Sequence, residues 1–168
     1  MRKNALTLAL TLVGAALLAS GCTADDRVTL PIADGGHVTI DGGKEVSTIT
    51  TDQGTVTLAG ENQLPEGFPK DIPIPGKAVI QASMKSEGKD GGEIYTVAYD
   101  IEQPFQEAKQ AVEDYFRGSG YKESTQFLDD SMYIIAGKKE LLSIHFTVSK
   151  DMEEDRRTSV TLVHEVKH

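Results

Sequence analysis

The sequence of 168 residues contains a single cysteine, Cys22. A chain with one thiol cannot form an intramolecular disulfide, so its stability has to come from a packed core. Cys22 follows a run of small residues close to the N-terminus. This position suggests a role outside the folded part of the protein.

Hydrophobic runs long enough to cross a membrane are also lacking. The uncharged apolar stretch at residues 5–19 follows Arg2 and Lys3 and ends before Asp25. Because a spanning helix needs roughly 20 apolar residues, this stretch is too short to be a membrane anchor. A basic start, a short apolar segment and small residues after it are typical of a cleaved signal peptide. We therefore expect residues 1–21 to direct export and to be removed.

The residues around the cysteine resemble the lipobox of bacterial lipoproteins, which here reads Leu18, Ala19, Ser20, Gly21, Cys22. Leu18 lies one place upstream of the commonest leucine position. The resemblance implies that a signal peptidase recognises residues 18–21 and that fatty acyl chains such as palmitate are attached through the Cys22 sulfur. Two chains hold a protein at a bilayer durably, since each buried methylene contributes about 0.8 kcal/mol. The alternative is an ordinary cleavage site beside an unmodified cysteine.

Basic residues are scarce relative to acidic ones. The chain has 17 Lys and Arg against 26 Asp and Glu, which gives a formal net charge of −9. Loss of Arg2 and Lys3 with the signal peptide would make the exported chain more acidic. Such a chain repels phosphate backbones, so we expect no nucleic-acid partner.

Aromatic residues are absent from residues 22–63, which are rich in Thr and Gly. Short β-branched runs such as "VTL", "VTI" and "TVTL" alternate with glycine-containing turns, a pattern typical of small hairpins. Strands without large side chains bury little, and isolated hairpins are marginally stable in water. The pattern is compatible with short strands and equally with a flexible stalk.

Residues 64–75 hold four of the six prolines of the chain. Proline fixes its own φ and pushes the preceding residue toward extended conformations, so we expect an extended connector. Apolar residues between the prolines favour a connector that lies against the following domain. A proline-rich ligand for a partner is the alternative.

Residues 76–168 carry the pattern of a folded α+β domain. Strand-like runs at 77–86 and 93–101 precede a segment that opens at Pro104 with apolar residues at helical spacing. Four more strand-like runs follow, starting near residues 121, 131, 141 and 158. The order β-β-α-β-β-β-β with short links predicts an antiparallel sheet of neighbouring strands with one amphipathic helix packed on one face.

This region also resembles the C-terminal part of small uncharacterised bacterial envelope lipoproteins. They share an opening motif LPxxFPxDxPxP, which residues 64–75 match, and a "GY" pair after the helix, here Gly120 and Tyr121. The resemblance implies architecture and no particular activity.

Motifs for catalysis and metal binding are missing. The "GSG" at 118–120 ends a helix, whereas a serine nucleophile elbow precedes one. His145 and His164 fall on opposite faces of their strands, and the acidic run at 151–155 lacks the glycine-pivoted spacing of a calcium loop. We expect no metal, no cofactor and no enzymatic activity.

Five tyrosines are left as candidates for a binding role. Tyr95, Tyr99 and Tyr115 could line a ligand groove between helix and sheet, although tyrosines more often rim a core. The sequence thus predicts a lipid-anchored, non-enzymatic envelope protein that contacts a protein partner or supports an envelope assembly. The alternative is a small-ligand-binding module that uses the tyrosine groove.

Overall fold

The fold consists of one large sheet and one helix. The structure, a computed structural model, describes residues 27–32, 36–41 and 46–167. Its elements are β1 (Arg27–Pro31), β2 (His37–Asp41), β3 (Val46–Thr51), β4 (Gly54–Leu58), β5 (Val79–Gly88), β6 (Glu93–Ile101), α1 (Phe105–Ser119), β7 (Lys122–Leu128), β8 (Met132–Lys139), β9 (Leu142–Lys150) and β10 (Thr158–Val166).

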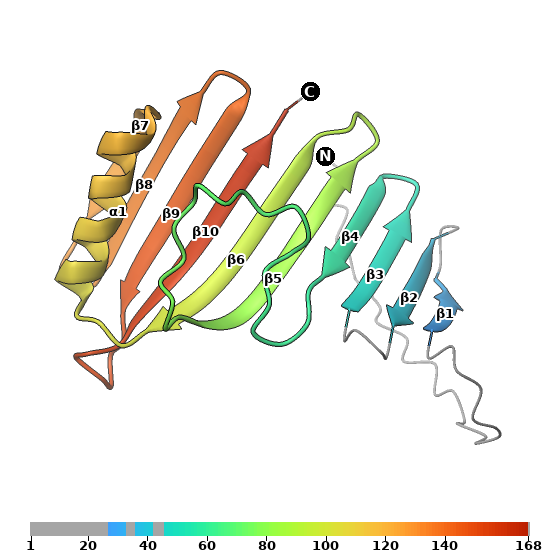
Figure 1. Cartoon of the computed structure of the whole chain (residues 1–168), viewed down its shortest axis with the longest axis horizontal. Helices are drawn as coiled ribbons and strands as arrows, with labels where there is room; N and C mark the ends of the chain where they lie inside the picture. The colour runs from blue at the N-terminus through green and yellow to red at the C-terminus, as the bar shows by residue number, and fades with distance from the viewer. Residues whose placement is uncertain (1–26, 33–35, 42–45, 168) are drawn as a thin grey trace, which may run out of the picture.

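All ten strands belong to a single antiparallel sheet in the order β1-β2-β3-β4-β5-β6-β10-β9-β8-β7 (Figure 1). The prediction of an α+β fold with an antiparallel sheet and one helix is confirmed at this level. The expectation that neighbouring strands follow one another in sequence is wrong at one place, because β6 pairs with β10 and not with β7. The segment with α1 takes the chain to the far edge, from which β7–β10 return toward β6.

Residues 27–58 form strands that continue the same sheet. β1–β4 pair as successive antiparallel neighbours, and β4 pairs with β5 between Gly54 and Leu58. The sequence was compatible with short strands or with a flexible stalk, and the described residues of this region form short strands. The predicted low burial also holds, since most side chains of β1–β4 are half-buried or exposed.

The core lies between α1 and the β6–β10 half of the sheet. The helix buries Phe105, Ala108, Val112 and Phe116, which recur at helical spacing and share one face. Phe116 meets Phe146 of β9 with ring centroids 6.0 Å apart. The helix begins at Phe105, one residue later than expected, with Pro104 as its N-cap. It ends at Ser119, and the C-cap residue Gly120 has a left-handed φ of 78°.

The connector at residues 64–75 covers the same face of the sheet beside the helix (Figure 1). Ile72 is buried in the core, and the ring of Phe68 lies edge-on to Tyr95 at 6.0 Å. The prolines at 65, 69, 73 and 75 rule out a regular ladder, while apolar residues between them reach the core. The connector thus lies against the sheet, as its composition predicts.

Candidate functional site

The residues predicted to carry the lipid anchor lie outside the described part of the chain. They are Leu18, Ala19, Ser20, Gly21 and Cys22. The anchor therefore stays a prediction. Within residues 27–32, 36–41 and 46–167, no helix has the length and hydropathy needed to cross a membrane.

The three tyrosines proposed for a groove lie where helix and connector cover the sheet. Tyr95 and Tyr99 are only 3% and 4% exposed, and Tyr115 is half-buried. Tyr99 and Tyr115 line a cavity of about 60 Å³ that is bounded by the connector and α1. Drug-sized ligands occupy pockets of about 300–1,000 Å³. In this conformation the tyrosines belong to the core and its rim, and the groove between them stays a prediction.

A polar pair within this core escaped the sequence analysis. His164 of β10 is 3% exposed, and its Nε2 lies 3.0 Å from the Oη of Tyr121, which follows the helix. Its Nδ1 has no hydrogen-bond partner in the described structure. Burial lowers the pKa of His164, against the charge of Asp71 in the connector, so the imidazole is held neutral. Alternation in β10 predicted a core-facing His164, but nothing in the sequence linked it to Tyr121.

The acidic loop between β9 and β10 is a structural turn. Asp151 accepts hydrogen bonds from the backbone N–H groups of Glu153 and Glu154 at 2.8 and 3.2 Å. Arg157 ties the loop to Asp100 of β6 through a 2.6 Å ion pair. Burial alone would raise the pKa of Asp100, but hydrogen bonds from Arg157, Ser159 and Gln81 outweigh it and lower that pKa. The described residues contain no cluster of three or more side chains able to hold a metal.

The polarity of the two sheet faces reverses along the sheet. On the face toward α1, β6, β8, β9 and β10 present buried apolar residues, whereas β1–β4 present mainly threonine. In register across that face lie Thr29, Thr39, Thr48 and Thr57.

The opposite face, which the helix leaves free, shows the reverse distribution. Its positions on β8–β10 are mostly polar or small, but those on β1–β6 are mostly apolar. We call nine contiguous apolar members of this second group the apolar strip: Val28, Leu30, Val38, Ile40, Ile49, Val56, Leu58, Met84 and Ile94. Val28 and Leu30 are 52% and 50% exposed, and no described element covers the strip.

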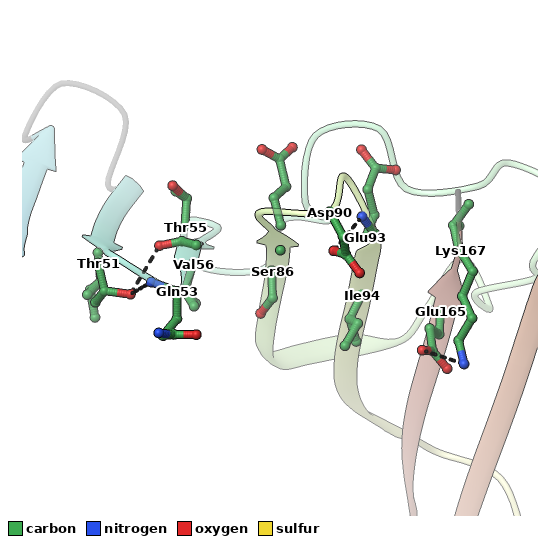
Figure 2. Close-up of a pocket in the computed structure, with 16 residues that line it drawn as sticks. Thr51, Gln53, Thr55, Val56, Ser86, Asp90, Glu93, Ile94, Glu165 and Lys167 are labelled. Carbon is green, nitrogen blue, oxygen red and sulfur yellow. Dashed lines mark hydrogen bonds and ion pairs between the residues drawn. The ribbon is translucent and has the colours of Figure 1, made fainter.

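A hollow of about 600 Å³ opens at one end of the apolar strip (Figure 2). Ile49, Val56 and Ile94 contribute its apolar floor, with Ser86 between them in register. The rim includes the tip of the β5–β6 hairpin, and four of its five charged residues are acidic: Glu87, Asp90, Glu93 and Glu165, with Lys167 as the fifth. At the far side Lys167 approaches Glu165 to 3.4 Å, and a hydrogen bond from Ser143 lowers the pKa of Glu165. An apolar floor with a charged rim suits a contact surface better than bond-breaking chemistry.

Comparison of the chain with family models, curated proteins and solved structures finds no match. The candidate site is therefore defined by its geometry, as the apolar strip together with the hollow at its end.

Proposed function

We propose that this chain is an exported, lipid-anchored protein of the bacterial cell envelope that works by surface contact and not by catalysis. The anchor is supported by the order of its parts in the sequence: Arg2 and Lys3, the apolar segment, and small residues directly before Cys22. The contact surface is the apolar strip on the helix-free face.

The strip is the observation that carries the proposal. Contiguous apolar patches larger than a few hundred Å² are uncommon on soluble monomers and mark interaction sites. The strip has nine apolar members in register on neighbouring strands, whereas the same face of β8–β10 has the polar composition of an ordinary solvated surface. A sheet face exposed only to water would be expected to be polar along its whole length, and this one is polar on β8–β10 only.

The polar groups inside the fold support a non-enzymatic role. The hydrogen-bond partner of the buried His164 is the hydroxyl of Tyr121, and a phenol with a raised pKa is a poor nucleophile. Asp100 is engaged by Arg157 and Ser159 at 2.6 Å each, which holds a loop in place. Both arrangements stabilise the fold.

Two measurements test the proposal. The mass of the Cys22 peptide from the native protein should include a diacylglyceryl group, and an unmodified peptide would contradict the anchor. Oxidative footprinting should then show Met84 of the strip at least about threefold better protected in the native envelope than in the lipid-free protein. Met152, which is 86% exposed in the β9–β10 loop, is the internal control. Equal oxidation of Met84 in both states would contradict the contact.

A small-ligand-binding role is the second candidate, and the hollow favours it. Its volume of about 600 Å³ falls within the range of about 300–1,000 Å³ common for ligand pockets. The ligand would then lie over Val56 and Ile94 and not at Tyr95, Tyr99 or Tyr115. An Ile94→Trp variant, which fills the floor, should abolish ligand-induced thermal stabilisation in a screen of envelope small molecules. Retained stabilisation would place the ligand elsewhere.

A further inference from the structure

The apolar strip is uncharged across its whole width. Together with the three polar residues in register beside them, its members form two rows: Leu30, Val38, Ile49, Val56, Ser86, Ile94 and Val28, Ile40, Ser47, Leu58, Met84, Thr96. None of these twelve side chains carries a charge, although 26% of the chain is charged. The occupant of these two rows is therefore recognised by apolar contact, and charged residues begin only beyond Ile94, at Glu165 of β10 and at the rim of the hollow.

β1–β4 form a single layer with two chemically different faces. The strip occupies one face, and the threonines occupy the other, where the hydroxyls of Thr29 and Thr39 lie 3.1 Å apart. An amphipathic helix with this division lies in a membrane interface, its apolar side down and its polar side in water. A single amphipathic sheet layer can do the same, because water at the membrane interface still solvates the unpaired backbone groups of its edge strand.

The strip begins close to the proposed anchor. Four residues separate Cys22 from Arg27, where β1 starts. A chain of that length spans at most about 18 Å when fully extended. An acylated Cys22 therefore keeps β1, and with it Val28 and Leu30, next to the bilayer surface.

We propose that the apolar strip docks on the surface of the phospholipid bilayer that carries the anchor, with the threonine face of β1–β4 toward water. This inference rests on the lipid anchor of the proposed function and names the occupant of its contact surface. The polar residues of β8–β10 on the same face do not have to contact the bilayer when the strip does. Neighbouring strands rotate by roughly 20–25° each, which turns the far half of the sheet away.

A bilayer fits this surface better than a second copy of the chain does. In two copies packed strip to strip, each hollow of about 600 Å³ would face either the other hollow or the β1 end of the other strip, and in the first arrangement the apolar floor stays unfilled. Protein interfaces are packed as densely as interiors, so such a void is unfavourable. Fluid acyl chains adapt to a concave floor.

The test uses two features of the sequence, a single cysteine and no tryptophan. The mature chain, residues 22–168, is coupled through the Cys22 thiol to a maleimide lipid in vesicles of phosphatidylcholine and phosphatidylglycerol, 3:1. Tryptophan is introduced in separate variants at two adjacent positions on opposite faces of β1, Leu30→Trp in the strip and Thr29→Trp on the threonine face. Circular dichroism checks that both variants fold.

Brominated lipids should quench the emission of the Leu30→Trp variant at least about twofold more than that of the Thr29→Trp variant, at low salt and at 0.5 M salt. Equal quenching, or none, would overturn the proposal. So would a dimer in light scattering of the untethered chain in which the Leu30→Trp emission is already shifted to the blue without lipid. Because this tether is introduced chemically, a negative quenching result would contradict the docking of the strip only. Natural lipidation is tested separately, by the mass of the Cys22 peptide.

Discussion

At the scale of single residues, the buried imidazole of His164 couples stability to pH. Burial lowers its pKa in the folded state, so the unfolded chain binds the proton more readily. The contribution of the neutral His164 to the free energy of unfolding should therefore be fully present above about pH 6.5. Below that pH the free energy of unfolding should fall, by up to about 1.4 kcal/mol per pH unit.

The His164→Leu variant isolates this contribution. The free energy of unfolding in urea is measured between pH 5 and 7.5 for this variant and for the unsubstituted chain. Subtracting the first from the second cancels the pH dependence that carboxylates give to both proteins. The difference should rise with pH and level off near pH 6.5. A difference that does not change over this range would mean that His164 is not held neutral in the fold.

Two glycines give opposite predictions for the same substitution. A Cβ at Gly137 of β8 would lie 2.7 Å from the Phe116 ring and 3.0 Å from the Lys122 carbonyl oxygen, so Gly137→Ala should destabilise the fold by about 1–3 kcal/mol. A Cβ at Gly118 in α1 meets nothing within 4 Å, so Gly118→Ala should stabilise by about 0.5 kcal/mol. Urea unfolding measures both, and shifts of the same sign would contradict the helix–sheet packing.

At the scale of elements, most strands and the helix could be predicted from the sequence, because their side-chain periodicity is local. Tyr95, Val97, Tyr99 and Ile101 alternate with outward residues in β6, and the structure buries all four. The pairing of β6 with β10 could not be predicted, because it joins segments about 60 residues apart through a helix crossing. The contact between Tyr121 and His164 depends on that pairing and was missed with it.

The strip was missed for a related reason. Alternation in "VTL" and "VTI" showed that valine, leucine and isoleucine share one side of each short strand. It could not show that four such sides, together with Met84 and Ile94, form one surface, because that requires the register between strands. Nor could it show that the helix covers the other face.

Single-layer strands and covered strands should differ in amide exchange. β2 and β3 have neighbours only within the sheet, whereas β9 and β10 also contribute to the core under α1 and the connector. Local opening of β2 and β3 should therefore require less free energy. In the lipid-free protein, hydrogen–deuterium exchange by mass spectrometry should be at least about tenfold faster for β2 and β3 peptides, and equal rates would contradict a single exposed layer.

At the scale of the whole molecule, the reversal of polarity along one sheet divides the protein into two parts. The β6–β10 half is a two-layer fold that buries its apolar face under α1 and the connector. The β1–β4 part has no such cover among the described elements and turns its apolar face the opposite way. The first part supplies stability, and the second supplies a surface beside the proposed anchor.

The most direct test of this division is photo-crosslinking in the native envelope. A benzophenone side chain is placed at Ile40 of the strip and, in a matched variant, at the adjacent Thr39 on the opposite face of β2. After illumination, mass spectrometry of the Ile40 variant should show phospholipid adducts that are absent from the Thr39 variant. Equal adducts at both positions, or none at Ile40, would contradict the claim that the strip is the surface through which this protein meets the membrane.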